Sequence, residues 1–459
     1  MATARADLPQ PVREALAKAG IAEIAVSAVV LAVDAPQPAI SHNARAAMNP
    51  ASVMKVVTSY AALDLLGPAF TFRTDVLVAA EITGGVLAGD LYLRGGGDPK
   101  LTTERVWQLA HALRSRGLRE IRGDIVIDRR YFAPLTHDPA RFDGEARRAY
   151  NGGPDALLVN FNAIAFRFVP DGQGVRVVAE PDLPNVEIAS RIQLTRGPCT
   201  SFRRDLSHDV IELGLIATIT FSGSYPAACG ERVLPLSLFD NARFAESNLR
   251  WLWSEVGGVL KGGVRAGAAP ADARLFLRTE SEPLASLVRD MNKHSNNVMA
   301  RNLFLALSAE RQAGGGDAAS SARVVTQWLQ SHMIDASDLV MENGSGLSRA
   351  ERASAALIAA VLKSAWSSAV MPELMSSFPV LATDGTLKSR RVAVGAGQAH
   401  LKGGTLNDVQ SLAGYVLDRG ARRWIVVMIV NHPKAGAARP AIDALVEWTY
   451  ESAAGKAKR

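Results

Sequence analysis

Hydrophobic and polar positions first follow an α/β pattern along the chain. An apolar run at Ile24–Val33 predicts a strand, and the apolar segment Ser52–Leu66 predicts a buried helix. Alternating positions at Val76–Ala80 and Val86–Leu93 then predict a hairpin whose turn is Gly84-Gly85. The pattern therefore changes from long elements to short strands soon after the predicted helix.

The middle of the chain is mostly β in pattern. A helix is predicted at Thr103–Arg116 and a strand at Asp124–Asp128, and the polar stretch 134–155 is typical of loops. From Ala156 to about Leu238, short apolar runs are separated by Gly, Pro and Asp. This spacing predicts a β-rich unit.

Helical periodicity returns in the last part of the chain. Helices are predicted at Asn241–Val256, Glu282–Met291, Val298–Leu307, Arg323–His332, Ser354–Ser364 and Ala441–Ala453. Strands are predicted at Leu412–Val416 and Trp424–Val430. The ends of the chain are therefore α/β and its middle is mainly β, which is typical of one domain interrupted by a long insertion.

This organisation predicts three domains. An α/β domain, with a sheet flanked by helices, would combine the two ends of the chain. A β-rich domain would be inserted in it, with a smaller domain nested inside the insertion. The expected bounds are 1–74 plus 275–459 for the α/β domain, 75–95 plus 156–274 for the β-rich domain, and 96–155 for the nested domain.

Composition and charge narrow the class of protein. With 459 residues, 48% hydrophobic and 21% charged, the chain can bury substantial cores and is not predicted to be disordered. The net charge is +6 and the pI about 9.4, but the basic residues form no stripe with interleaved aromatics, so no nucleic-acid binding is expected. The longest clean apolar run, Trp424–Val430, has the length of a strand, and no transmembrane segment is predicted.

Two features of the sequence leave the cellular compartment open. The first residues, MATARADLPQPVREAL, lack the apolar stretch of a secretion signal, so the chain is either cytoplasmic or a mature segment restarted with Met. The two cysteines, Cys199 and Cys229, lie in turn-like sequence. They would stay thiols in the cytosol and could close a loop of roughly 30 residues in an oxidising compartment.

The stretch Ser52-Val53-Met54-Lys55 opens the predicted buried helix and is the first candidate for chemistry. Positions i and i+3 of a helix share a face, so the Ser52 hydroxyl and the Lys55 amine can meet. A serine hydroxyl needs a base, and a lysine amine acts as one only where burial or a nearby cation lowers its pKa. The alternative is a serine helix cap followed by a lysine that extends to solvent.

Two further short motifs contain groups that could complete such a site. Ser295-Asn296-Asn297, between two predicted helices, offers a hydroxyl and an amide, although an ordinary helix cap would look the same. Lys402-Gly403-Gly404-Thr405 precedes a predicted strand; its lysine could attract a carboxylate and its glycines could admit a substrate backbone, although a plain turn is the alternative. The eight histidines form no metal-binding pattern, and we expect neither a metal nor a cofactor.

In their order and context, the three motifs resemble the active-site signature of serine penicillin-recognising enzymes. The stretches LYLRGGGDPKLT, GDIVIDRRYF, NGSGLSR, DGTLKSR and LKGGTLNDVQSLAGY are similar to class C low-molecular-mass penicillin-binding proteins, the D-alanyl-D-alanine carboxypeptidase/endopeptidase family. The resemblance covers nearly the whole chain and implies a β-lactamase-like transpeptidase fold interrupted by a long β-rich insertion. It further implies a periplasmic serine peptidase that cleaves peptidoglycan stem peptides and is acylated by β-lactams, with a homodimer left open. By the same resemblance, Cys199 and Cys229 would form a disulfide.

The resemblance also implies a role for each motif residue. Ser52 would be the acylated nucleophile and Lys55 its general base. Ser295 would pass a proton to the leaving D-alanine nitrogen, and Asn297 would orient the substrate amide. Lys402 would set the potential of the site and hold the terminal carboxylate of the substrate.

Further roles fall on backbone groups and on the insertion. The backbone N–H groups of Ser52 and Thr405 would form the oxyanion hole, and Gly403–Thr405 would line the bound substrate. Glu145, with Asp143 as the alternative, would meet the free amino end of the stem peptide's diamino acid; the plain reading of either is a solvated loop carboxylate.

The chain departs from the family at two positions. Gly403 stands where the family has Thr or Ser, whose hydroxyl binds the terminal carboxylate, and Asn343 stands where Asp is common. The chain would therefore favour endopeptidase cleavage, rely on the Thr405 hydroxyl, or turn over slowly. The alternatives are a β-lactamase or esterase built on the same groups, and a wall-binding protein whose site has decayed at Gly403.

Overall fold

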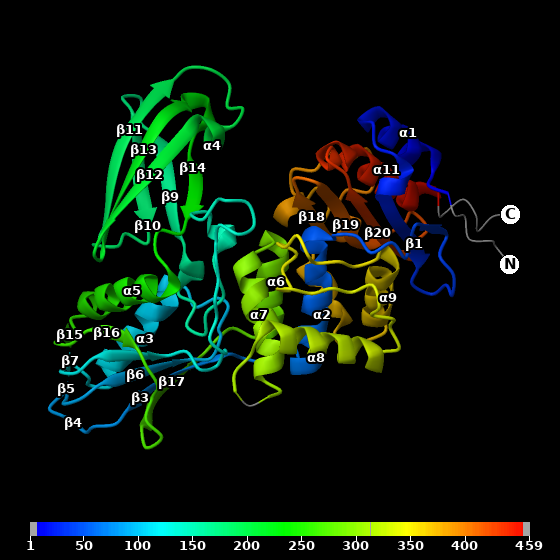
Figure 1. Ribbon diagram of the computed structural model, residues 1–459. Coiled ribbons are helices and arrows are strands. Elements are labelled where there is room, and N and C mark those ends of the chain that lie inside the picture. Colours follow the sequence, from blue (N-terminus) through cyan, green and yellow to red (C-terminus); the bar gives the residue numbers. More distant parts are fainter. Residues whose placement is uncertain (1–6, 313, 453–459) are drawn as a thin grey trace. The chain divides into compact units, whose positions relative to one another are not determined.

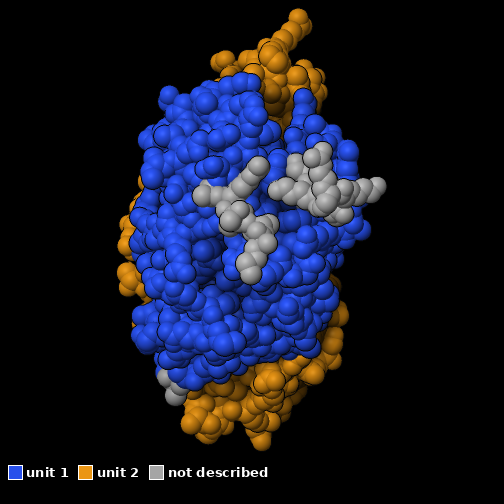
Figure 2. All heavy atoms as spheres, turned by 90° about the vertical axis from the view of Figure 1, so that its right-hand side faces the viewer, with its two compact units in different colours: residues 1–71, 282–459 blue, residues 72–281 orange. Residues whose placement is uncertain are grey.

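The computed structural model describes residues 7–312 and 314–452 (Figure 1). The chain divides into two compact units: unit 1 is Met1–Thr71 with Glu282–Arg459, and unit 2 is Phe72–Ser281 (Figure 2). Six residues of the N-terminal stretch without a signal-like pattern lie outside the described residues, as does the end of the last predicted helix. Within the described ranges, no helix has the length and apolar character needed to cross a membrane.

Unit 1 is built on an antiparallel sheet with strand order β18-β19-β20-β1-β2. Its strands are β1 (Val26–Ala32), β2 (Ile40–His42), β18 (Ala399–Leu406), β19 (Val409–Leu417) and β20 (Arg423–Asn431). The inner strands are buried on both faces, which explains why β1 and β20 are continuous apolar runs in the sequence. β18 lies at the edge of the sheet and was missed by the hydrophobic pattern, because two of its residues are glycines.

Helices cover both faces of this sheet (Figure 1). α1 (Gln10–Ala19) and α11 (Arg439–Ser452) pack against each other, and their apolar side chains share a core with alternate strand residues such as Val26 and Met428. α9 (Ala355–Trp366) contacts β1, β19 and β20. Because successive strand residues point to opposite faces, the other strand residues face α9. The sheet is therefore the middle of three layers, as expected for a sheet flanked by helices.

The central helix of unit 1 is α2 (Met54–Leu66). The helices that pack around it are α6 (Leu284–His294), α7 (Asn297–Ala309), α8 (Ala318–Ser331), α9 and α10 (Met371–Ser377). Every residue from Met54 to Leu63 is buried as a result. A helix that is apolar on all sides is a core helix, so the prediction of a buried helix here is confirmed.

Unit 2 is mainly β, as the pattern predicts. Its sheets have the strand orders β16-β8-β6-β3-β17, β15-β7-β5-β4, β10-β9-β14 and β11-β13-β12. The strands are β3 (Arg73–Val78), β4 (Ile82–Thr83), β5 (Val86–Leu87), β6 (Leu91–Gly95), β7 (Glu120–Ile121), β8 (Ile125–Asp128), β9 (Ile164–Pro170), β10 (Val175–Glu180), β11 (Val186–Thr195), β12 (Leu206–Leu213), β13 (Ile216–Pro226), β14 (Arg232–Leu236), β15 (Val259–Leu260), β16 (Val264–Ala266) and β17 (Arg274–Glu280). The helices are α3 (Thr103–Ser115), α4 (Phe202–Asp205) and α5 (Asn241–Glu255), and α3 packs against α5.

The predicted hairpin in unit 2 is confirmed in its pairing: Val76 lies opposite Leu93, and Val78 lies opposite Leu91. The Gly84-Gly85 turn joins the short strands β4 and β5, and the β3–β6 pair continues the same antiparallel register after an interruption. The apolar run Val86–Leu93 is split between two sheets, because Asp90 leaves the strand and its Oδ1 accepts a hydrogen bond from Asp124 N (2.8 Å). The pattern of apolar residues does not show this break. The separate nested domain at 96–155 stays a prediction. Two strands of that range, β7 and β8, pair with strands that lie before and after it in the sequence.

The two ends of the insertion lie together. Phe72 N donates a hydrogen bond to Ser281 Oγ (2.9 Å), and Ser281 N donates one to Phe72 O (2.8 Å). The adjacent strands β3 and β17 continue this contact as an antiparallel pair. The insertion therefore begins and ends at neighbouring positions.

Candidate active site

The first motif lies where the chain enters the central helix. Ser52 is in a 3-10 turn, Ala51–Val53, that continues directly into α2, so Lys55 follows one turn later. Ser52 is partly exposed, whereas Lys55 is fully buried. Lys55 Nζ donates a hydrogen bond to Ser52 Oγ at 3.1 Å. The two groups that the spacing placed on one face therefore meet, and the lysine does not extend to solvent.

Lys55 is also held by acceptors from two other segments. Its Nζ donates to Asn297 Oδ1 (2.7 Å) and to the backbone oxygen of Ser345 (2.5 Å). Burial lowers the pKa of Lys55 well below its usual value, and the nearby charge of Lys402 lowers this pKa further. The environment therefore favours a neutral amine. Its two N–H groups can serve Asn297 and Ser345, and its lone pair can then accept the proton of the Ser52 hydroxyl.

The second motif is a turn between α6 and α7. Ser295 has a left-handed conformation (φ 54°) and ends α6. Asn296 is the cap of α7, because its Oδ1 accepts hydrogen bonds from Val298 N (3.0 Å) and Met299 N (3.1 Å). Capping thus falls to the middle residue of the motif, which leaves the side chains of Ser295 and Asn297 available to contact the two lysines.

The third motif lies within the edge strand β18, directly before the predicted strand that forms β19. The fully buried Lys402 Nζ donates to Ser295 Oγ (2.8 Å) and to the backbone oxygen of Gly403 (2.7 Å). Burial lowers the pKa of Lys402 to about 7. All three motifs are therefore brought together: Lys55 joins the first to the second, and Lys402 joins the second to the third.

Two glycines allow the backbone to close around Ser52. A methyl group at Gly404 would lie 2.3 Å from Ser411 Oγ and 2.9 Å from Ser52 N. A methyl group at Gly346 (φ 82°) would lie 1.9 Å from the backbone oxygen of Ala51. Strand β18 and the 344–346 turn therefore pack directly against the peptide that carries the serine.

The loop 342–351, to which the sequence analysis gave no role beside Lys55, affects the charge of this lysine. The fully buried Glu351 accepts three backbone hydrogen bonds at Oε1, from the N–H groups of Glu342 (3.2 Å), Asn343 (2.9 Å) and Gly344 (2.8 Å). Burial raises the pKa of Glu351, and its charge in turn raises the pKa of Lys55. The NGSGLSR stretch carried the family resemblance, but nothing in the sequence marks a glutamate beyond it as buried.

Asn343 takes part in the same loop. Its Oδ1 accepts hydrogen bonds from Ser345 N (2.9 Å) and Ser345 Oγ (2.6 Å). These bonds fix the turn whose carbonyl oxygen contacts Lys55. An asparagine therefore suffices at this position, where the family commonly has aspartate.

The remaining candidate residues are Thr405 in unit 1 and Glu145 and Asp143 in unit 2. Thr405 is exposed at the end of β18, and its Oγ1 accepts a hydrogen bond from Gln410 (3.2 Å). Glu145 is exposed in unit 2, where it pairs with Arg148 (3.3 Å). Asp143 is also in unit 2 and accepts a hydrogen bond from the Tyr150 hydroxyl (2.8 Å).

The two cysteines of unit 2 form a disulfide bond, Cys199–Cys229, so this prediction is confirmed. No group of three or more His, Cys, Asp or Glu side chains that could hold a metal occurs within residues 7–312 and 314–452.

The fold and the site are typical of one class of protein: serine hydrolases in which a lysine amine, rather than a histidine, contacts the serine hydroxyl. A family model described as the D-Ala-D-Ala carboxypeptidase 3 (S13) family matches residues 8–452. The chain therefore belongs to this family. The family resemblance and the enzyme class expected from the sequence, a serine-type D-Ala-D-Ala peptidase, are confirmed.

Individual relatives agree with this assignment. A D-alanyl-D-alanine carboxypeptidase of Actinomadura sp. (strain R39) is 29% identical over 86% of this chain and 75% of its own length. Penicillin binding protein 4 from Haemophilus influenzae has a similar fold, with a TM-score of 0.78 at 22% identity over 97% of this chain and all of that one. Its structure in complex with a β-lactam gives a TM-score of 0.75 at 21% identity, over 96% of this chain and 100% of that one. A predatory peptidoglycan endopeptidase from Bdellovibrio bacteriovorus gives a TM-score of 0.54 at 17% identity, over 92% of each chain.

Proposed function

We propose that Ser52 is the acylated nucleophile of this peptidase and that peptidoglycan stem peptides are its substrates. The observation that carries this proposal is the 3.1 Å contact between Ser52 Oγ and the Nζ of a fully buried lysine with a lowered pKa. Ser52 Oγ attacks the carbonyl carbon of the penultimate D-alanine, and its proton moves to the neutral amine of Lys55. The backbone N–H groups of Ser52 and Thr405 stabilise the oxyanion that forms.

Breakdown of the tetrahedral intermediate then releases the C-terminal part of the substrate. The C–N bond breaks, Ser52 keeps the acyl group as an ester, and the leaving nitrogen takes a proton from Ser295 Oγ. Lys402 resupplies this proton through its 2.8 Å hydrogen bond to Ser295. Asn297 orients the substrate amide. Before hydrolysis, Lys55 releases the proton taken from Ser52 to solvent, and Lys402 takes one up. Water then attacks the ester with the neutral Lys55 as the base that receives its proton, and this proton passes to Ser52 Oγ when the ester bond breaks.

The third motif bears on the choice between two cuts. Gly403 offers no hydroxyl for a free terminal carboxylate, which leaves Lys402 and Thr405 to bind it. In a cross-link between two stem peptides, the group that leaves is the side-chain amine of a diamino acid and not a terminal D-alanine. We therefore place endopeptidase cleavage ahead of carboxypeptidase cleavage. Mass spectrometry of digested muropeptides separates the products of the two cuts, and a predominance of free D-alanine would contradict this order.

The compartment and the partners follow from the same proposal. A disulfide between Cys199 and Cys229 is typical of an oxidising compartment, which supports the periplasm. Glu145 is the proposed contact for the amino end of the diamino acid in the stem peptide. A homodimer stays a prediction, and the mass of the protein in solution tests it.

A fluorescent penicillin tests the covalent step. We expect the wild type to be labelled, Ser52→Ala to be unlabelled, and Ser376→Ala, a control at an exposed serine, to be labelled like the wild type. Label on Ser52→Ala, or on none of the proteins, would exclude the mechanism. Rapid loss of the label from the wild type would instead favour a β-lactamase.

A further inference from the structure

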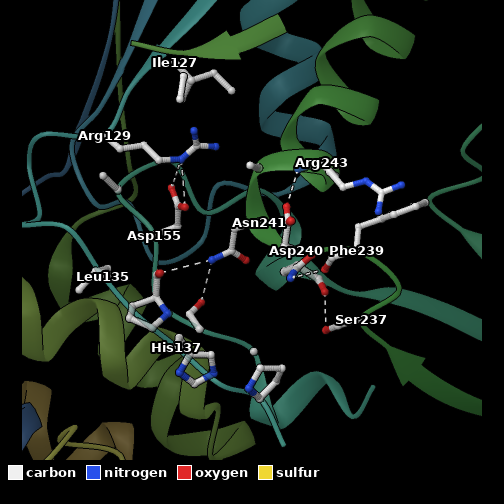
Figure 3. Close-up of a pocket in the computed structure, with 18 of the residues that line it drawn as sticks. Ile127, Arg129, Leu135, His137, Asp155, Ser237, Phe239, Asp240, Asn241 and Arg243 are labelled. Atoms are coloured by element: carbon white, nitrogen blue, oxygen red, sulfur yellow. Dashed lines mark hydrogen bonds and ion pairs between the residues drawn. The ribbon is translucent and has the colours of Figure 1, made fainter. Parts of the chain in front are cut away.

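Charged pairs occur in both units, and one of them lies beside the proposed chemistry. Unit 2 contains a pocket of about 840 Å³ that is lined by its own residues (Figure 3). Arginines of its lining are paired with carboxylates, as Figure 3 shows for Arg129 and Asp155 (3.0 Å), so this pocket does not select a ligand by charge. In unit 1, by contrast, Lys293 stands two residues before Ser295 and is paired with Asp384.

Lys293 and Asp384 form an ion pair that the proposed reaction does not use. Lys293 lies in the last turn of α6, and its side chain is only 10% exposed. Its Nζ lies 2.6 Å from Asp384 Oδ2 and donates a second hydrogen bond to Phe378 O (2.7 Å), at the end of α10. A buried ammonium group is costly without such partners, so the lysine ties the end of α6 to the segment 378–384.

Asp384 fixes the turn of this segment. Its Oδ1 accepts a hydrogen bond from Val380 N (2.6 Å). Burial raises the pKa of Asp384, but the hydrogen bonds from Lys293 and Val380 outweigh this effect and hold the pKa below its usual value. The carboxylate is therefore charged at neutral pH, and the ion pair is present there.

The same segment pairs with the outer edge of β18. Leu401 N donates a hydrogen bond to Pro379 O (2.8 Å). Leu381 N donates one to Ala399 O (2.9 Å). This pairing ends one residue before Lys402. The segment therefore connects the end of α6 to the strand that carries the third motif.

The segment also packs directly against both elements. Gly385 has a φ of 55°, and a methyl group there would lie 2.7 Å from Lys293 O. Leu387 lies beside the third motif, because its Cδ2 would be 3.8 Å from a methyl group at Gly403. Movement of this segment would therefore shift the end of α6 relative to β18.

We propose that Lys293 and Asp384 are positioning residues that hold Ser295 Oγ within hydrogen-bonding distance of Lys402 Nζ. These two atoms are 2.8 Å apart and lie on different elements, and the ion pair fixes the segment that contacts both elements. The inference rests on the proposed function, in which this contact delivers the proton to the leaving nitrogen. Lys55 is bound by other segments, so loss of the pair impairs proton delivery and not the attack of the serine.

Two substrates that differ in the leaving atom test the proposal. One is a D-Ala-D-Ala peptide, and the other is the thioester in which sulfur replaces the nitrogen of the scissile bond. An amide nitrogen must be protonated to leave, whereas a thiol can leave as a thiolate. The measured quantity is kcat/KM for the amide divided by kcat/KM for the thioester. Binding of the shared acyl group and of the terminal carboxylate cancels in this ratio.

We expect Lys293→Met and Asp384→Asn each to lower this ratio by about 10–100-fold, because a general acid contributes about 10²–10⁴-fold and a displaced one loses part of this. The double variant leaves no unpaired charge, so it should fold and lose no more than either single variant. Asp443→Asn removes the carboxylate of another ion pair of unit 1, with Arg390, and should keep the wild-type ratio. Unfolding temperatures are measured in parallel.

The other outcomes decide against the positioning role. Equal losses on the amide and the thioester would make the pair purely structural and overturn the inference, as would a wild-type ratio in the double variant. Ser295→Ala tests the proposed function separately. A wild-type ratio in Ser295→Ala would refute the proton relay, and the inference with it. A lowered ratio there, with a wild-type ratio in Lys293→Met, would refute the positioning role alone.

Discussion

Replacing Gly404 by alanine would place a methyl group between the edge strand and the peptide that carries Ser52. The new Cβ would lie 2.3 Å from Ser411 Oγ, 2.8 Å from Pro50 O and 2.9 Å from Ser52 N. Ser411 Oγ cannot rotate away without losing its hydrogen bond to Pro50 O (2.7 Å), so the strand or the 3-10 turn must move. Either movement displaces one of the two proposed oxyanion donors relative to the other.

The size of the effect follows from this geometry. Extra volume in a packed interior costs about 1–3 kcal/mol of folding stability, which the chain can tolerate. Loss of one oxyanion donor costs about 10²–10³ in rate. We therefore expect Gly404→Ala to fold but to be acylated by penicillin at least about 100-fold more slowly than the wild type.

The neighbouring glycine provides a matched control. A methyl group at Gly403 would meet its nearest atoms at 3.8 and 3.9 Å, which is ordinary van der Waals contact. Gly403→Ala should therefore keep an acylation rate within a few-fold of the wild type. The assay is the second-order rate of labelling by a fluorescent penicillin, with the unfolding temperature of each variant measured in parallel. Equal rates for Gly404→Ala and the wild type would refute the packing argument, as would equal losses in both variants.

Three other changes give distinct outcomes. Gly403→Thr restores the hydroxyl that the family has at this position, and D-alanine release from a D-Ala-D-Ala peptide should rise through a lower KM; unchanged release with intact acylation would mean that another donor already binds the carboxylate. The pKa of Lys402 is about 7, so the fraction of its ammonium form falls as the pH rises through this value, and KM for the same peptide should increase above it; a KM that is constant across this range would remove Lys402 from carboxylate binding. Glu351→Gln removes a charge that raises the pKa of Lys55, so the acid limb of the acylation profile should move to lower pH. A lower rate with an unmoved limb would assign Glu351 to loop structure alone.

The long elements of this fold could be predicted from the sequence, because burial on both faces leaves a continuous apolar run. The β1 and β20 strands and the α2 helix show this directly. The bounds of β18 could not be predicted from hydrophobic periodicity, because two of its residues are glycines, and only the Lys-Gly-Gly sequence indicates an edge strand there. The hairpin around Gly84-Gly85 could also be predicted, but not its interruption near Asp90, which the apolar pattern does not show.

The candidate site shows the same division. Ser52 and Lys55 could be linked by helical spacing alone, but Ser295, Asn297 and Lys402 could be joined to them only through the family resemblance. No local pattern relates side chains so far apart along the chain. Glu351 was missed altogether, because its importance comes from three backbone N–H groups that only the folded loop presents.

The meeting of Phe72 and Ser281 has a consequence for how the chain reaches its native state. Between the first two motifs lies a segment almost as long as unit 1 itself, and closing so long a flexible loop would oppose formation of the site. The segment folds with its own two ends hydrogen-bonded to each other. The loop that unit 1 must close is therefore effectively as short as a hairpin turn. The distance along the chain between Lys55 and Ser295 is thereby removed as an entropic obstacle, and the insertion could change in length during evolution without disturbing the serine–lysine site.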